Sequence, residues 1–176
     1  MPAADPVDPQ EGSLQARPPR PPKPLKARAI ALLARRDYSR TELRDKLTAR
    51  GGHGADATDD VDALLDELAA LGFLSDARFA QSVVRQKSGG YSKRAIGSAL
   101  KARGVEGEAA TDALASVEID DLDAMIALWR RRFGVPPAND KEKARQARFL
   151  QSRGFSLSSI FKLLRNPPGE NDADAS

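Results

Sequence analysis

Hydrophobic residues between positions 26 and 166 recur at the spacing of one face of an α-helix. The first clear stripe, at i, i+3, i+4 and i+7, is Val61, Leu64, Leu65 and Leu68. Two later stripes follow the same spacing: Leu122, Met125, Ile126 and Trp129, with Phe133 one turn further, and Leu157, Ile160, Phe161 and Leu164. Such stripes are typical of amphipathic helices. No segment alternates apolar and polar residues over a sustained length, so the pattern predicts an all-α protein.

Polar and glycine residues that flank the stripes fit the beginnings and ends of helices. Ser39 and Glu42 have the spacing of a capping box, in which each side chain bonds the other residue's backbone N–H. Further N-caps are expected at Thr58, Ser75, Ser92 and Ser156. Helix ends are expected at Gly51, Gly72, Gly104 and Gly154.

A short motif occurs three times along the chain. Each copy has a leucine four residues before a glycine and an arginine directly before it: Leu47, Arg50 and Gly51; Leu100, Arg103 and Gly104; Leu150, Arg153 and Gly154. The repetition predicts three units of three helices, residues 26–73, 74–118 and 119–166, or about nine helices in all. Stacked units of this size form elongated or curved arrays. Residues 1–25, which hold most of the twelve prolines, and residues 167–176 are expected to be disordered tails.

The net charge is only +3, but charge is distributed in bands. Residues 26–56, 78–105 and 124–166 are predominantly basic, whereas residues 57–77 and 106–123 carry acidic side chains and no basic ones. In terms of the repeat, the central helix of each unit is basic and the third helix of the first two units is acidic. This banding indicates a binding protein with surfaces of opposite charge.

The chain lacks the residues that most catalytic and metal sites require. There is no cysteine, and His53 is the single histidine. Phosphate-binding loops of the Walker type and Ser-His-Asp arrangements are also missing. The acidic clusters Asp59/Asp60/Asp62 and Asp120/Asp121/Asp123 are better explained as first-turn carboxylates that favour helix beginnings. We therefore expect no enzyme, no cofactor and no metal. With no candidate membrane span and no signal-peptide pattern, the expected location is the cytoplasm.

The basic central helices are the strongest candidates for a binding surface. Their cations, together with the Arg130–Arg132 run, are expected to contact the phosphates of DNA or the acidic groove of a nucleoprotein filament. The candidate residues are Arg40, Arg44, Lys46, Arg50, Lys93, Arg94, Lys101, Arg103, Arg130, Arg131, Arg132, Lys141, Lys143, Arg145, Arg148 and Arg153. The alternative is a solvated face paired with neighbouring acidic helices, or, for the arginine run, cations that stabilise a helix C-terminus. Trp129 is expected in the core rather than as a base-stacking platform.

One stretch of the second unit resembles a known family. Leu71-Gly-Phe-Leu-Ser-Asp-Ala-Arg-Phe-Ala80, followed by Val83, Val84, Arg85, Gly90, Ile96, Leu100 and Arg103-Gly104-Val105, is similar to the core of the bacterial regulatory protein RecX family. Phe149-Leu-Gln-Ser-Arg-Gly-Phe155 and Ile160 resemble its third repeat. The resemblance covers about residues 26–166. It implies a non-enzymatic protein that binds the RecA recombinase filament on DNA, and restrains its recombinase and co-protease activities.

The resemblance also implies binding partners, and this chain departs from the family pattern in three places. The expected partners are the RecA filament and the phosphates of single- and double-stranded DNA, with no membrane and no small-molecule substrate; a monomer is expected. The proline-rich tail and the loop Gly51-Gly-His-Gly54 depart from the family pattern, and Gln146 replaces an aliphatic residue and should thin the third core. Two other functions remain open: a stand-alone non-specific DNA-binding protein, and a protein-only scaffold that uses the proline tail.

Overall fold

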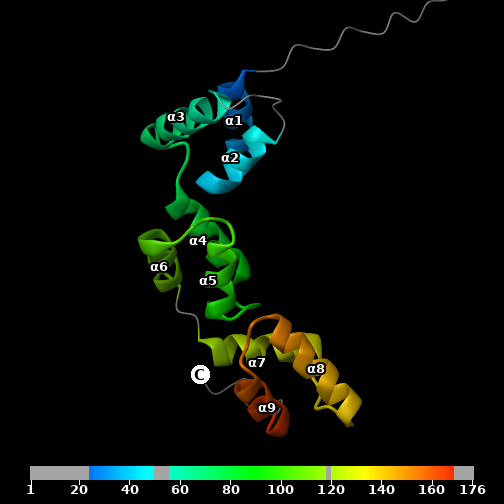
Figure 1. Ribbon diagram of the computed structural model, residues 1–176. Helices are drawn as coiled ribbons and strands as arrows, with labels where there is room; N and C mark the ends of the chain where they lie inside the picture. The colour runs from blue at the N-terminus through cyan, green and yellow to red at the C-terminus, as the bar shows by residue number, and fades with distance from the viewer. Residues whose placement is uncertain (1–23, 50–55, 118–119, 169–176) are drawn as a thin grey trace, which may run out of the picture.

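The computed structural model describes residues 24–49, 56–117 and 120–168, and within these ranges the chain forms nine α-helices and no strand. The first unit contains α1 (Leu25–Leu33), α2 (Arg40–Thr48) and α3 (Asp56–Ala70). The second contains α4 (Asp76–Lys87), α5 (Lys93–Lys101) and α6 (Gly107–Ala115). The third contains α7 (Asp121–Arg132), α8 (Asp140–Ser152) and α9 (Leu157–Arg165). The units follow one another along an elongated molecule (Figure 1), as predicted for an all-α tandem array.

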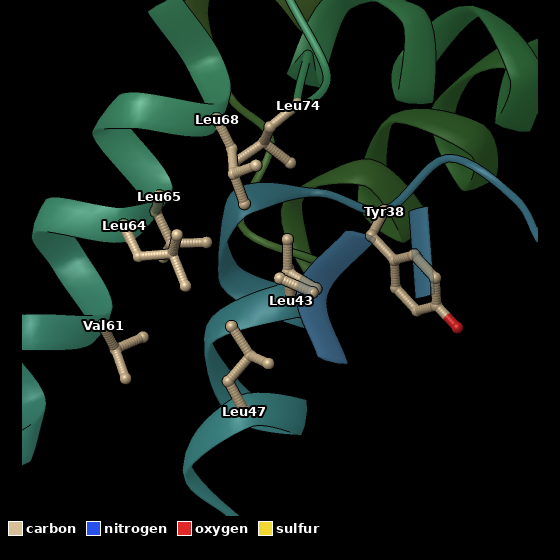
Figure 2. Packing of buried hydrophobic residues seen from close by; sticks show 9 residues of the cluster. Tyr38, Leu43, Leu47, Val61, Leu64, Leu65, Leu68 and Leu74 are labelled. Carbon is tan, nitrogen blue, oxygen red and sulfur yellow. The ribbon is translucent and has the colours of Figure 1, made fainter. Parts of the chain in front are cut away.

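Each unit has a hydrophobic core of its own. In the first, Leu43 and Leu47 of α2 face the stripe from Val61 to Leu68 on α3 (Figure 2). In the second, Phe79, Val84, Ile96 and Leu100 are among the buried residues, and in the third the core gathers around Met125, Trp129, Leu150 and Ile160. The first cluster extends beyond its unit only by Leu74, the residue that begins the second unit, and the other two clusters stay within their units. Because a unit of this size has few residues to bury, each core is small.

Serine caps begin four of the helices, as predicted. The hydroxyl of Ser39 accepts a hydrogen bond from the backbone N–H of the residue three positions later, and Ser75, Ser92 and Ser156 do the same. The prediction of a cap at Thr58 was wrong: α3 begins at Asp56, because the segment Asp56-Ala57 is compatible with a first helical turn and extends the helix toward the N-terminus.

Only half of the predicted capping box forms. Ser39 Oγ accepts from the Glu42 N–H at 3.1 Å, but the Glu42 carboxylate contacts Arg36 and Arg103 at 3.2 and 3.6 Å. Two cations thus draw the carboxylate away from the backbone N–H of Ser39.

The predicted stripes on α7 and α9 are rotated relative to the buried faces. Leu122 is 48% exposed, and α7 buries Met125, Leu128 and Trp129 instead. On α9, Leu157 and Phe161 are exposed, and the buried residues are Ile160, Leu163 and Leu164. Each of these helices carries apolar residues on more than one face, and packing within the unit selects which of them are buried.

Glycines end helices where predicted. Gly72, Gly104 and Gly154 all have positive φ, and the N–H of the residue after each bonds back to a leucine carbonyl in the preceding helix. Gly51 and His53 lie outside the described residues, as do residues 1–23 and 169–176 of the expected tails. Within the described part of the chain, no helix combines the length and hydropathy that a membrane span needs.

Candidate nucleic-acid interface

Two predicted site residues of the first unit are paired within their own chain. Arg40 Nη1 lies 2.8 Å from the Asp66 carboxylate, and Arg44 Nη2 lies 2.8 Å from that of Asp62. The acidic helix α3 therefore neutralises part of the basic helix α2, as the alternative interpretation of these residues required. Lys46 is exposed and makes no ion pair with any described residue, whereas Arg50 lies outside the described residues.

The cations of α5 and its end divide between solvent and neighbouring units. Lys93 and Arg94 are exposed at the beginning of the helix, and Arg94 reaches the Gly154 carbonyl oxygen at 3.3 Å. Lys101 lies 3.6 Å from Glu106 in a highly exposed pair. Arg103 lies 3.6 Å from Glu42 of the first unit and also covers the Phe79 ring. Of these four, Arg103 is used mainly inside the molecule.

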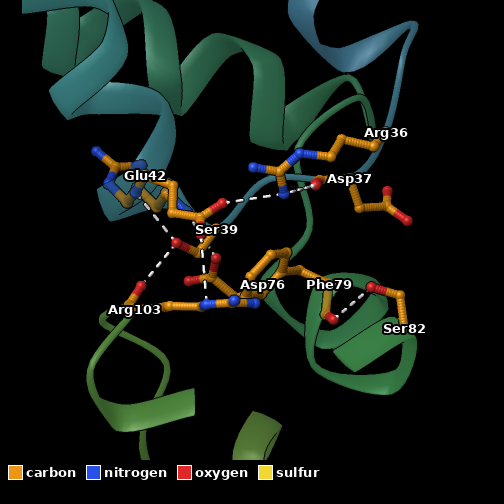
Figure 3. Close-up of polar contacts among 9 residues, drawn as sticks. Arg36, Asp37, Ser39, Glu42, Asp76, Phe79, Ser82 and Arg103 are labelled. Carbon is orange, nitrogen blue, oxygen red and sulfur yellow. Dashed lines mark hydrogen bonds and ion pairs between the residues drawn. The ribbon is translucent and has the colours of Figure 1, made fainter. Parts of the chain in front are cut away.

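A polar joint connects the first and second units (Figure 3). Ser39 Oγ, while capping α2, donates a hydrogen bond to the Arg103 carbonyl oxygen at 2.6 Å. The first backbone N–H of α2, from Arg40, donates to Asp76 Oδ1 at 2.8 Å. One serine and one aspartate thus hold the beginning of α2 against α4 and against the end of α5.

The same joint is used a second time between the second and third units. Ser92 Oγ donates to the Gly154 carbonyl oxygen at 2.8 Å, and the first N–H of α5, from Lys93, donates to Asp121 Oδ1 at 2.7 Å. The positions of Ser92 and Asp121 match those of Ser39 and Asp76. We refer to these two arrangements as the first and second joints.

Close approach of backbone at the joints explains the repeated Arg-Gly motif. A Cβ added to Gly104 would lie 2.7 Å from Thr41 Cβ, and one added to Gly154 would lie 2.5 Å from Ala95 Cβ. Arg153, beside Gly154, donates to the Tyr91 hydroxyl and stacks over the Tyr91 ring at 4.7 Å. The sequence revealed the motif as a repeat but did not show its role in joining units.

The third unit carries the largest set of exposed cations. Lys141, Lys143, Arg145 and Arg148 on α8 are all exposed and form no ion pair within the described residues. Lys141, Arg145 and Arg148 are spaced i, i+4 and i+7, so they share one face of the helix. They line a shallow hollow together with Asn139 and Glu142. We call these three residues the α8 row.

Aromatic rings lie beside several guanidinium groups of this unit. Phe133 and Phe149 pack edge to face with their centroids 5.4 Å apart. Arg145 lies 5.8 Å from the Phe133 ring, and Arg132 lies 5.9 Å from the Phe149 ring. Cation–π contacts of this kind orient the guanidinium groups. Arg131 is exposed at the end of α7, and Arg130 is half-buried and engaged in a contact.

Three members of the acidic clusters have structural roles. Asp120 caps α7 by accepting from the N–H groups of Leu122 and Asp123 at 2.6 and 3.1 Å. Asp121 belongs to the second joint, and Asp62 pairs with Arg44. Among the residues that the structure describes, no three His, Cys, Asp or Glu side chains are grouped as metal ligands.

Gln146 corrects one expectation about the third core. Its side chain is buried, its Oε1 accepts from Trp129 Nε1 at 2.8 Å, and its Nε2 donates to the Val135 carbonyl oxygen at 3.2 Å. The amide therefore satisfies the indole N–H of Trp129, which is in the core as predicted. Glutamine in place of the expected aliphatic residue thus anchors Trp129 and the segment after α7 by hydrogen bonds, and it does not merely reduce the apolar packing.

Comparison with known families matches all three units. Residues 26–68, 75–114 and 118–164 match the models of the first, second and third three-helix domains of RecX, respectively. The match therefore extends over most of the chain and follows the order of the units.

Named relatives and solved structures agree with this. Regulatory protein RecX of Leptothrix cholodnii is 43% identical over 150 residues, which cover 85% of this chain and 93% of that protein. Regulatory protein RecX of Ralstonia nicotianae is 39% identical, covering 84% and 90%. The crystal structure of RecX from Lactobacillus salivarius shares the fold, with a TM-score of 0.58 and 21% identity over 80% of this chain and 94% of that one. The protein described here thus belongs to the RecX family of regulatory proteins.

Proposed function

We propose that this protein binds the RecA recombinase filament on DNA and restrains strand exchange and co-protease activity. Membership of a family of regulatory proteins supports a role by binding. We further propose that residues 26–73, 74–118 and 119–166 act as three successive contact modules, and that the protein works in the cytoplasm, where the DNA is.

The α8 row is the observation that carries the proposal. Arg40 and Arg44 are already paired with carboxylates of their own chain. An approaching phosphate therefore gains less electrostatic stabilisation from them than from an unpaired cation, because the carboxylates already neutralise their charge. Lys141, Arg145 and Arg148 have no such partner among the described residues, so they are the candidates to neutralise phosphates. Such contacts position a protein on DNA without reading its sequence. Occupation of a filament groove or end would then block extension without any bond-making step.

A filament titration tests the proposal. The protein is added to a RecA filament on single-stranded DNA while ATP hydrolysis and filament length are followed. We expect both to fall at sub-saturating amounts relative to DNA sites. An effect no larger than that of an unrelated protein that masks the same amount of DNA would contradict the proposal.

A matched pair of variants assigns the effect to α8. Arg145→Glu/Arg148→Glu and Lys162→Glu/Arg165→Glu change the net charge equally, and all four residues are exposed helical cations of the third unit. We expect the first pair to weaken filament inhibition strongly and the second to leave it nearly intact. Equal losses in both would show that total charge, and not the α8 row, determines binding.

The exposed cations also favour a second candidate function, a stand-alone non-specific DNA-binding protein. It predicts DNA binding with no dependence on the recombinase, and the same titration separates the two functions. A protein-only scaffold instead requires the proline-rich segment. Deletion of residues 1–23, which ends before α1 begins at Leu25, should leave filament inhibition largely intact if the helical units carry the activity.

A further inference from the structure

A groove in the first unit lies apart from the α8 row. It has a volume of about 490 Å³. The described residues that line it come from α1 (Arg28, Ala31, Leu32), the turn that follows (Arg35, Tyr38) and the end of α2 (Lys46, Ala49). The groove shares no residue with the α8 row, and two of its cations, Arg28 and Arg35, are outside the set that the sequence indicated.

The charge of the groove is positive. Three of its described lining residues are cations and none is a carboxylate. Arg35 and Lys46 are exposed and form no ion pair or hydrogen bond through their side chains with other described residues. Arg28 donates one hydrogen bond, from Nη2 to the Leu47 carbonyl oxygen at 3.4 Å. Neighbouring cations behave differently, because Arg40 and Arg44 are paired with carboxylates of α3.

Tyr38 gives the groove a fixed polar group. The residue is only 7% exposed, and the guanidinium carbon of Arg36 lies 3.8 Å from the centroid of its ring. Lys46 Nζ lies 5.9 Å from the same ring. The hydroxyl points away from the leucine core (Figure 2) and forms no hydrogen bond with the described residues. A buried ring with an unused hydroxyl is thus held beside three cations.

We propose that this groove binds a nucleotide unit, with its phosphate among Arg28, Arg35 and Lys46 and its sugar or base against Ala31, Leu32 and Ala49. Separated cations and a tyrosine hydroxyl are typical phosphate contacts. An acidic helical peptide fits less well, because two alanines and a half-buried leucine offer no deep pockets for the large apolar anchors by which such peptides dock. The nucleotide unit belongs either to a strand or to a free nucleotide. The inference requires no recombinase.

Titration of the full-length, ¹⁵N-labelled protein tests the groove directly. Three probes are added at constant ionic strength: a short oligothymidylate, free ATP, and a glutamate-rich peptide. We expect the backbone amides of Ala31, Leu32 and Ala49 to shift with a nucleotide probe and to stay unchanged with the peptide. A response to oligothymidylate alone assigns the site to a strand, and an equal or stronger response to ATP assigns it to a free nucleotide. Unmoved groove amides, or an equal response to the peptide, would overturn the proposal.

Variants separate this site from the α8 row. Arg35→Glu/Lys46→Glu should weaken the binding that shifts these amides about tenfold or more, since two phosphate contacts are replaced by repulsion. Arg85→Glu/Lys162→Glu, with the same change of charge on exposed residues of α4 and α9, should not. Tyr38→Phe keeps the ring and should weaken binding a few-fold. If Arg145→Glu/Arg148→Glu abolishes the amide shifts and Arg35→Glu/Lys46→Glu does not, the groove is not the binding site. A protein that fails to inhibit the filament would contradict the proposed function but would not change what these shifts show about the groove.

Discussion

At the scale of single residues, the pair of Trp129 and Gln146 shows how a polar group can belong to a core. An indole N–H removed from water without an acceptor is unfavourable, and the Gln146 amide supplies that acceptor at 2.8 Å. The other end of the amide is satisfied by the Val135 carbonyl oxygen, so the glutamine also ties the segment after α7 to α8.

Replacement of Gln146 by leucine tests this pair. The apolar side chain fills a similar volume but leaves the Trp129 N–H and the Val135 carbonyl without their partner, so we expect a destabilisation of about 1–3 kcal/mol. Urea unfolding followed by fluorescence measures it at the right place, because Trp129 is the only tryptophan. A variant as stable as the parent would show that water replaces the amide at no cost.

A third core residue, Leu128, shows the limit of sequence patterns at this scale. Leu122 and Leu128 are both apolar residues of α7, yet one is exposed and the other is buried. Helical spacing places residues on faces, but it cannot decide which of two overlapping faces the neighbouring helices cover. That choice depends on the packing of α8 and α9, which the sequence of α7 does not contain.

The two leucines provide a matched test of that packing. Leu128→Ala should lower the free energy of unfolding by about 2–5 kcal/mol, because it leaves a cavity among buried residues. Leu122→Ala should change it by no more than about 0.5 kcal/mol, as is usual at exposed positions. Chemical denaturation of both variants measures the difference; similar losses would place Leu122 in the core.

At the scale of elements, the two joints explain why the Arg-Gly motif repeats. Gly104 and Gly154 end their helices and also let the backbone approach the beginning of the preceding unit's central helix. The sequence predicted their role as helix ends correctly, because positive φ after a helix is a local property. It could not reveal the close approach, because Thr41 and Ala95 lie far away along the chain.

A glycine series separates these two roles. Gly72 has the same positive φ as Gly104, but nothing lies within 4 Å of a Cβ added there. Gly72→Ala should therefore cost about 1–2 kcal/mol for the left-handed backbone alone. Gly104→Ala and Gly154→Ala should cost more and should also change the small-angle X-ray scattering profile, because the units must separate. Three equal costs and an unchanged profile would contradict the joints.

At the scale of the whole molecule, the three separate cores distinguish this protein from a single compact domain. The sequence predicted the helices, their grouping into three and the elongated form, since those depend on spacing and repetition. It left the pairing of the cations open: the charge bands place an acidic helix after Arg44 and none after Arg148, but they do not show which cations that helix contacts, and the structure pairs Arg44 with Asp62. Which cations remain available is decided by tertiary structure.

Charge reversal of the whole α8 row gives a measurable consequence for DNA binding. With Lys141, Arg145 and Arg148 changed to glutamate, the slope of log K against log salt for duplex DNA should fall in magnitude by about 2–3, since each lost phosphate contact contributes about 0.9. Titrations at several salt concentrations give the slope. An unchanged slope would show that this face points away from the DNA.

The polar character of the joints affects the mechanical behaviour of the molecule. Each joint is held by serine and aspartate side chains that bond to backbone groups, and apart from Leu74, which packs on the first core, no apolar cluster crosses it. Bending between units therefore strains a few directional bonds while every core stays intact. Rigid units connected by flexible joints can change their relative angles to follow the curvature of a partner. Contacts made by one unit then need not break when the next unit binds.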